Sequence, residues 1–262
     1  MFKRAALIGF SGVALVACSG VAGTKGGLDA PVTTGGDGGG ANCDKNPEGD
    51  CYPAADWGTN RAAFSSGGVR TTAGSTMRNY KWFGFKTGAI DRGVANLDDN
   101  LKTVSLADYY DPKGTRGIKV IHLVASSRWC SVCSQETKNY LVKNHAANTA
   151  SGIVVLQTMI DGLRQGVAAT SKDIDEWSAS TGIFVALQYG DGVALKTGSL
   201  LFTLALDPDN KNFGPFFDGA GVPWNGWLDA RTMEIIDYAV GFNPAGDVAA
   251  LTYVGANTPK GQ

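Results

Sequence analysis

Two cysteines separated by two residues, Cys130 and Cys133, are the side chains in this sequence best suited to chemistry. They follow an almost wholly apolar, β-branched stretch, residues 118–125, which predicts a strand buried on both faces. No helix breaker follows Cys133, so the chain can turn directly into a helix. The unpaired N–H groups and positive dipole end of a helix start favour a thiolate, and a cysteine pKa in that setting can fall to roughly 3.5–7.5. The pattern therefore predicts a dithiol redox site.

In such a site the Cys130 thiolate attacks a disulfide in a partner, and Cys133 then resolves the mixed disulfide. The reverse flow oxidises the thiols of a partner. Arg128, close before Cys130, is expected to stabilise the thiolate together with the helix start. This chemistry needs no cofactor other than the redox-active disulfide itself, and we expect no metal.

The segment from Trp129 to Cys133, reading WCSVC, and the strand before it resemble the thioredoxin-like superfamily, especially its membrane-anchored thiol–disulfide oxidoreductases of the TlpA type. Residues 104–110 resemble the segment that precedes the first central strand of redoxin domains. Residues 221–229 resemble the cis-proline loop and the strand that leaves it. The resemblance implies a thioredoxin-like α/β fold, in which helices flank a central mixed β-sheet, with an N-terminal hairpin extension.

The resemblance also implies a role for Glu136, which stands where some anchored members keep an active-site glutamate. Such a carboxylate can take the proton that Cys133 must lose before it attacks, as a general base. The alternative is a solvated carboxylate in the first helical turn, stabilised by the helix dipole.

A substrate-binding surface is implied around the same cysteines. Pro223 is expected to be cis and to place the Val222 backbone beside the sulfurs, where it can pair with an extended substrate strand. Trp129 is expected on the same surface. Trp224 is expected either to floor the substrate groove or to be a core aromatic residue.

The sequence also departs from the superfamily. Thioredoxins proper carry a buried acid six residues before the first cysteine, a position that Val124 occupies here. The residues between the cysteines are neither the Gly-Pro of thioredoxin nor a pair with the histidine of strong oxidants. The direction of electron flow is therefore open, and the resemblance to anchored reductants favours the reducing side. His122, on the same strand face as Val124, is expected to be a hydrogen-bonded core histidine rather than a proton relay.

The first 17 residues have the pattern of a bacterial targeting segment. A charged start precedes an apolar stretch, residues 5–15, which is too short to span a bilayer. Residues 15–18, Leu-Val-Ala-Cys, resemble a lipobox, so we expect cleavage before Cys18 and lipidation of its thiol. The alternative is an ordinary secretory peptide. Ser19, by resemblance to the sorting rule of Gram-negative lipoproteins, favours a lipid-anchored place in the cell envelope at the outer membrane.

Composition divides the rest of the chain into three parts. Residues 18–42 are rich in glycine and lack an apolar period, which predicts a flexible tether after the acylated cysteine. Residues 43–74 are expected to form an irregular N-terminal extension, and residues 75–262 the thioredoxin-like domain. Within the extension, Cys43 and Cys51 are expected to form a structural disulfide. Four cysteines remain once Cys18 is acylated, and an even number of cysteines in an exported protein suggests disulfides. The alternative is a second redox or metal pair, but seven intervening residues do not suit a zinc knuckle.

Strand and helix patterns alternate through the domain, which predicts βαβ units with parallel strands. The predicted strands are residues 78–86, which would begin a short hairpin with a turn near 84–88, and residues 152–160, 200–206, 225–229 and 234–240. The predicted helices are residues 106–110, 133–147, 170–182 with a capping box, and 247–254. Residues 184–198 are expected to form a hairpin insertion.

Partners and rival functions follow from the same residues. The formal net charge of −1 lacks the excess of basic residues that is typical of nucleic-acid-binding domains. The expected partners are the thiols or disulfides of exported proteins and an unidentified redox partner.

The nearest rival is a peroxiredoxin-like thiol peroxidase, whose P-x-x-x-[ST]-x-x-C pattern Ser127 fits, although Leu123 stands where the proline belongs.

Two further alternatives come from other classes. Copper-handling relatives resemble C-x-x-x-C with a distant histidine, whereas this chain has one residue fewer between its cysteines and no histidine after His145. Attached c-type haem would need a histidine where Ser134 stands. A non-catalytic surface lipoprotein that keeps the fold as a binding scaffold is the last alternative, and the intact pair of Cys130 and Cys133 disfavours it.

Overall fold

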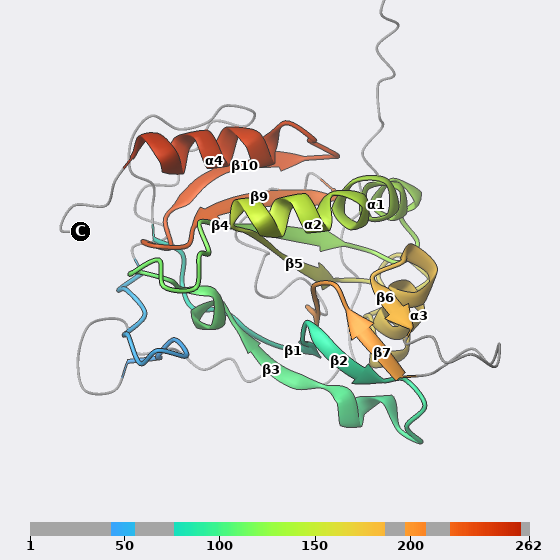
Figure 1. Ribbon diagram of the computed structural model, residues 1–262. Coiled ribbons are helices and arrows are strands. Elements are labelled where there is room, and N and C mark those ends of the chain that lie inside the picture. The colour runs from blue at the N-terminus through green and yellow to red at the C-terminus, as the bar shows by residue number, and fades with distance from the viewer. Residues whose placement is uncertain (1–42, 56–75, 187–196, 208–220, 258–262) are drawn as a thin grey trace, which may run out of the picture.

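The computed structural model describes residues 43–55, 76–186, 197–207 and 221–257 (Figure 1). The expected signal peptide, the expected lipidation site Cys18, the expected tether and residues 56–74 of the expected extension lie outside the described residues. Among the described helices, none is long and apolar enough to cross a lipid bilayer.

The apolar stretch predicted as a buried strand forms β4 (Val120–Ser126), in which every residue is buried. It lies inside a seven-stranded sheet of order β10-β9-β4-β5-β8-β1-β3. β4 pairs in parallel with β5 (Ile153–Met159) and antiparallel with β9 (Trp224–Asp229). β8 (Thr203–Leu206) continues the sheet in parallel with β5. The expected α/β class, a central mixed sheet flanked by helices, is thereby confirmed.

One helical run connects β4 to β5 and presents the cysteines. It consists of α1 (Ser131–Glu136), a π-helical turn η4 (Thr137–Leu141) and α2 (Val142–Ser151). The run ends at Gly152, whose φ of 89° suits the left-handed conformation that closes many helices. The predicted helix 133–147 is therefore confirmed, and it extends by a turn at its C-terminal end.

Two other helices were also predicted. α3 (Ser171–Thr181) begins with the expected capping box, in which the side chains of Thr170 and Asp173 each accept from the other residue's backbone N–H. α4 (Gly246–Ala256) follows β10 (Ile235–Val240), which pairs antiparallel with β9 as expected. α4 packs against β9, β10 and β4, and it therefore covers the sheet beside the cysteine-bearing helix (Figure 1).

The N-terminal hairpin has a different turn from the predicted one. β1 (Lys81–Phe85) pairs with β3 (Lys102–Ser105), and on its other side β1 pairs with β8. Gly84, expected near a turn, lies inside β1, because its lack of a Cβ lets the backbone of β8 approach closely. The hairpin therefore forms one edge of the central sheet. The brief helix predicted after it is η3 (Leu106–Tyr109).

A second, three-stranded sheet contains the hairpin expected at residues 184–198. It has the order β2-β7-β6, with β2 (Gly88–Asp91), β7 (Thr197–Leu200) and β6 (Phe184–Ala186) all antiparallel. The prediction of one strand over residues 200–206 was wrong, because Leu200 ends β7 and a new strand, β8, begins at Thr203. Leu200 and all four residues of β8 are buried, so the run reads as one apolar stretch although it belongs to two sheets. A 3₁₀ turn, η2 (Leu97–Asn100), precedes β3.

Cys43 and Cys51 form a disulfide in a short loop that ion pairs hold against the domain. Asp44 pairs with Lys81 at 2.7 Å, and Glu48 pairs with Arg116 at 3.1 Å. In Figure 1 this loop (blue) lies well apart from α1. Its contacts are thus with the body of the domain and not with the candidate site.

Gly84→Ala is expected to destabilise the fold by about 1–3 kcal/mol, because an added Cβ would lie 2.4 Å from the carbonyl oxygen of Leu204. The matched control is Gly255→Ala in α4, where a Cβ meets nothing within 4 Å and alanine is the better helix former by roughly 0.5–1 kcal/mol. Relative to the unaltered chain, the urea midpoint of unfolding should fall in Gly84→Ala and rise in Gly255→Ala. Equal midpoints for Gly84→Ala and the unaltered chain would contradict the close approach of β1 and β8.

Candidate active site

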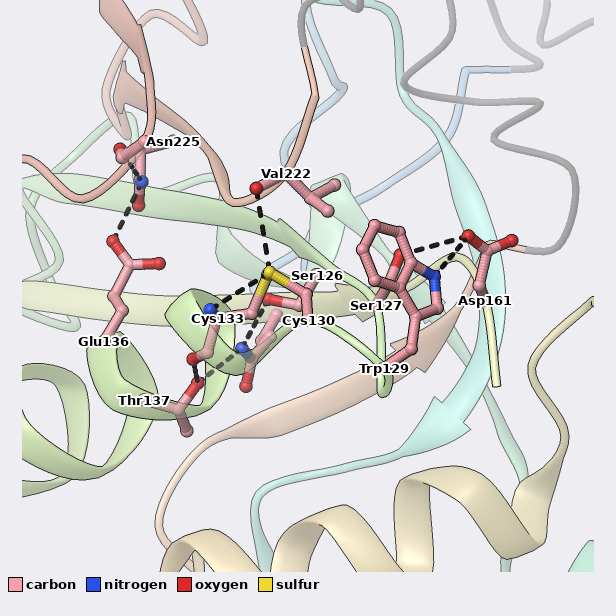
Figure 2. Close-up of a disulfide and its surroundings, with 12 residues drawn as sticks. Ser126, Ser127, Trp129, Cys130, Cys133, Glu136, Thr137, Asp161, Val222 and Asn225 are labelled. Carbon is pink, nitrogen blue, oxygen red and sulfur yellow. Dashed lines mark hydrogen bonds between the residues drawn. A yellow bond between two sulfur atoms is a disulfide. The ribbon is translucent and has the colours of Figure 1, made fainter. Parts of the chain in front are cut away.

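The cysteine pair lies where β4 ends and the helical run begins (Figure 2). Cys130 is the N-cap residue of α1, and the backbone N–H of Cys133 donates to the Cys130 Sγ at 3.2 Å. The two residues form a disulfide with their Cα atoms 5.3 Å apart. A thiolate at Cys130 would receive the same N–H donor and the positive end of the helix dipole.

The sulfurs of the cysteine pair are buried. Cys130 is 1% exposed and Cys133 is fully buried. Any exchange with another protein therefore requires a local opening that uncovers the Sγ of Cys130.

The loop before β9 lies beside the sulfurs. The peptide bond between Val222 and Pro223 is cis, and the carbonyl oxygen of Val222 lies 3.7 Å from the Cys130 Sγ (Figure 2). Both residues are buried, so the Val222 backbone faces the cysteine pair and presents no open edge to a substrate strand.

Trp129 is positioned by the loop that follows β5. Its indole N–H donates to Asp161 Oδ2 at 2.9 Å, and the Ser127 hydroxyl donates to the same oxygen at 3.3 Å (Figure 2). Two backbone hydrogen bonds join the same loops, from Arg128 to Asp161 and from Trp129 to Gly162. Sequence reasoning missed Asp161. Its available signal was an acid just past a second buried parallel strand, because neighbouring parallel strands end at the same sheet edge.

Arg128 does not serve the thiolate as expected. Its guanidinium donates to Asp173 Oδ1 at 2.8 Å and also pairs with Glu176. Two carboxylates on α3 therefore offset its charge, and Arg128 joins the cysteine loop to the start of that helix. Sequence spacing alone could not identify these partners.

Trp224 is a core aromatic residue and does not form the floor of a substrate groove. It is 1% exposed, and its ring stacks on Tyr238 with centroids 6.2 Å apart. The substrate-binding role considered for Trp224 is therefore corrected.

Glu136 is buried, so the alternative of a solvated carboxylate was wrong. It is 2% exposed, and its Oε1 accepts from Asn225 Nδ2 at 2.9 Å. Its Oε2 is buried without a hydrogen-bond partner, and in Figure 2 it points to the side on which Cys133 lies. Burial raises the pKa of Glu136 to about 7, against the opposing effects of the His122 charge and the Asn225 hydrogen bond. A carboxyl with this pKa can take or release a proton near neutral pH.

A buried polar cluster that sequence reasoning missed lies next to Cys133. Gln157 donates from its amide to the hydroxyls of Ser126 at 2.8 Å and Thr137 at 2.9 Å, and Trp177 donates to its carbonyl at 3.2 Å. Thr137 in turn donates to the backbone carbonyl of Cys133 at 2.8 Å. The cluster ties the cysteine-bearing helix to β4, β5 and α3, because buried polar groups must find partners.

His122 is buried and hydrogen-bonded, as expected of a core histidine. Its Nε2 lies 2.7 Å from Asn225 Oδ1, and its ring stacks on Trp227. Within the part of the chain that the structure describes, no cluster of three or more His, Cys, Asp or Glu side chains could hold a metal ion.

No family model and no curated protein matches the chain. Solved structures with a similar chain path include the thioredoxin domain of a thiol-disulfide oxidoreductase from Bacteroides vulgatus, at 15% identity and a TM-score of 0.42, with 72% of this chain and 100% of that one covered. A thiol:disulfide interchange protein from Bacteroides sp. is 18% identical with a TM-score of 0.41, over 72% and 93% of the two chains. Mycobacterium tuberculosis AhpC is 17% identical with a TM-score of 0.45, over 71% and 92%. At these values the likenesses carry no weight on activity.

Glu136→Gln is expected to stabilise the oxidised protein by about 1–3 kcal/mol at pH 8 and to leave its stability at pH 4.5 unchanged. The folded pKa of Glu136 lies above its ordinary value of 4.5, so the folded state binds the proton more tightly. The free energy of unfolding therefore falls as pH rises from 4.5 to 7. Above pH 7 the full cost of keeping an ionised carboxylate buried applies. Glutamine carries no such penalty. Urea unfolding at both pH values measures the difference, and an equal offset at both would contradict a perturbed carboxyl.

Proposed function

We propose that this chain is a thiol–disulfide oxidoreductase of the thioredoxin-like type, with Cys130 as the nucleophile and Cys133 as the resolving thiol. The observation that carries the proposal is the donation of the Cys133 N–H to the Cys130 Sγ at a helix start, 3.7 Å from the Val222 carbonyl oxygen. A dithiol held in this way favours the thiolate and closes a disulfide without moving the backbone far.

The exchange proceeds in two steps. The Cys130 thiolate attacks one sulfur of a partner disulfide, whose S–S bond breaks, and the second partner sulfur leaves as a thiolate and takes a proton. Cys133 then gives its proton to the Glu136 carboxylate and attacks the Cys130 Sγ, which releases the first partner sulfur. Two electrons pass to the partner, whose two sulfurs become thiols, and the enzyme keeps a Cys130–Cys133 disulfide. The reverse sequence oxidises a partner.

Burial of the cysteines adds a requirement to this mechanism. Because Cys130 is 1% exposed, the Sγ must be uncovered before a partner sulfur can reach it. The site is thus closed at rest, and opening is expected to limit the rate with large substrates.

The cellular setting of the proposal comes from the N-terminal sequence. The lipobox-like residues 15–18 support cleavage before Cys18 and a lipid anchor in the cell envelope, with the outer membrane favoured. The proposed partners are the thiols or disulfides of exported proteins and a redox partner that keeps the pair reduced or oxidised. The pair of Cys130 and Cys133 needs no added cofactor.

Cys133→Ser is expected to trap a stable mixed disulfide, because the resolving thiol is absent while the Cys130 nucleophile remains. Incubating the reduced variant with oxidised insulin and measuring the adduct by intact mass tests this expectation. Cys130→Ser should form no adduct, and both variants should lose insulin reduction. The control is the double variant Cys43→Ala with Cys51→Ala, which leaves the site untouched and should retain the activity. An adduct on Cys133 instead of Cys130 would reverse the assigned roles.

A thiol peroxidase is the second candidate, and the burial of Cys130 is the observation in its favour, since a small peroxide reaches a buried sulfur more easily than a protein strand does. Against it, the Ser127 hydroxyl donates its proton to Asp161, so this hydroxyl does not donate to Cys130. Comparing the rate of hydrogen peroxide consumption with that of insulin reduction separates the two activities. Rapid reaction of peroxide at Cys130 with negligible insulin reduction would favour the peroxidase.

The reduction potential of the Cys130–Cys133 pair is expected on the reducing side, nearer to about −270 mV than to about −120 mV. The ground is the resemblance of the motif to anchored reductants. Equilibration of the purified chain with glutathione buffers, followed by thiol trapping, measures the potential. A value near that of the strong oxidants would show that electrons flow into this protein from its partners.

A further inference from the structure

A chain of buried polar side chains runs from Glu136 to helix α4, and only its first member belongs to the mechanism above. Asn225 donates from Nδ2 to Glu136 Oε1 at 2.9 Å, and its Oδ1 lies 2.7 Å from His122 Nε2. His122 Nδ1 lies 2.9 Å from Asp247 Oδ1 in an ion-pair contact. All four side chains are buried, so each polar contact replaces water that the interior excludes.

The proton on His122 Nε2 follows from the orientation of the Asn225 amide. Asn225 Nδ2 also donates to the backbone carbonyl of Gly241 at 3.0 Å. A carbonyl oxygen can only accept, so the nitrogen of the amide must face Gly241 and Glu136. The amide oxygen therefore faces His122, and the Nε2 atom must carry a proton to donate to it.

The proton on the other ring nitrogen follows from the surroundings of Asp247. This carboxylate accepts from the indole of Trp227 at 2.8 Å and from Tyr140 and Asn148 at 2.9 Å each. Burial acts to raise the pKa of Asp247, but the His122 charge and these hydrogen bonds outweigh it and hold that pKa well below its usual range. Nδ1 makes no hydrogen bond, but the negative charge of an ionised carboxylate 2.9 Å away favours a proton on that nitrogen. His122 is thus an imidazolium, stacked on Trp227 at 4.9 Å.

The position of α4 depends on a glycine. A Cβ at Gly246 would lie 2.1 Å from the Trp227 ring, so only glycine lets the first turn of α4 approach that ring closely. This approach places Asp247, the next residue, against both Trp227 and His122.

We propose that His122, held as a buried imidazolium by Asp247, is a positioning residue for proton transfer at Glu136. It orients the Glu136 carboxyl group through Asn225, and its positive charge stabilises the ionised form of that group. The inference rests on the proposed dithiol exchange. In the transfer, the S–H bond of Cys133 breaks, an O–H bond forms at Glu136, and no electrons are exchanged. His122 keeps both of its protons throughout, because the ionised Asp247 lies against Nδ1 and the Asn225 amide oxygen lies against Nε2.

Several charged or titratable groups face Glu136 and set its affinity for a proton. They are His122 from β4, Asp247 from α4, Tyr140 from η4 and the cysteine pair at the start of α1. His122 stands one amide away from the carboxylate, whereas Asp247 lies on the far side of the imidazole. The nearer charge is positive, so its removal makes Glu136 hold its proton more tightly.

The protonation of His122 can be measured without any substitution. Nitrogen NMR of the 15N-histidine-labelled, oxidised chain should show both His122 ring nitrogens protonated across pH 5–8. Asp247→Asn should convert His122 to a neutral ring at pH 7, since burial alone disfavours the cation. A neutral His122 in the unaltered chain, or an unchanged imidazolium in Asp247→Asn, would overturn the inference.

The effect on Glu136 has a matched pair of variants, because the chain has two histidines. In the oxidised protein, carboxyl 13C NMR should show the Glu136 titration shifted upward by about one unit or more in His122→Gln. It should be unshifted in His145→Gln, whose side chain lies on α2 outside this chain of contacts. The peak is assigned by its loss in Glu136→Gln.

The same variants test the resolving step. The reduced protein is mixed with 5,5′-dithiobis(2-nitrobenzoate), and release of the second nitrothiobenzoate reports attack by Cys133. His122→Gln should shift the pH midpoint of this release upward by the amount seen for Glu136, and His145→Gln should not. An unshifted Glu136 titration in folded His122→Gln would overturn the inference and leave the proposed function standing. Failure of the unaltered chain to reduce insulin would remove the proposed function, whereas the NMR titrations would still test the coupling.

Discussion

The pairing of β4 on both of its sides is the constraint on which the site depends. Its registers with β5 and β9 set Val124 opposite both Gln157 and Asn225. Because directly opposite residues project to the same face of a sheet, the two amides lie beneath the helical run that carries the cysteines. Gln157 there reaches Thr137, and Asn225 reaches Glu136. A slip of one residue in either register would move an amide to the other face and leave its buried partner unsatisfied.

The same pairing explains how the site has a buried acid although Val124 occupies the position where thioredoxins carry theirs. Here the carboxyl comes from the helix as Glu136, and Asn225, the cross-strand neighbour of Val124, is its donor. Asp247 is the second buried carboxyl near His122, and it has three neutral donors where Glu136 has one. Burial raises the pKa of Glu136, whereas at Asp247 the adjacent His122 charge, helped by hydrogen bonds, outweighs burial and lowers the pKa.

The surroundings of Cys130 are held more firmly than the motif alone suggests. Asp161 accepts from Trp129 and Ser127, two backbone bonds join the same loops, and Arg128 is paired with α3. These contacts fix the residues that precede Cys130, while its sulfur remains buried. The proposed exchange therefore requires a motion that uncovers Cys130, whereas the residues around it are already in place.

Features that depend on residues close together in the chain could be predicted from the amino-acid sequence. The apolar run that became β4, the capping box at Thr170 and the cysteine pair at a helix start are all of this kind, because burial on both faces, caps and the Cys133-to-Cys130 hydrogen bond involve neighbours within a few residues. The contacts between residues far apart in the chain could not be predicted in this way, because they depend on how the elements pack. Glu136 and Asn225 are 89 residues apart, and His122 lies on β4 whereas Asp247 lies on α4, the last described helix. A pattern of residue types reports how buried a segment is, whereas the partner of a buried polar side chain depends on strand register and helix packing, which no local pattern contains.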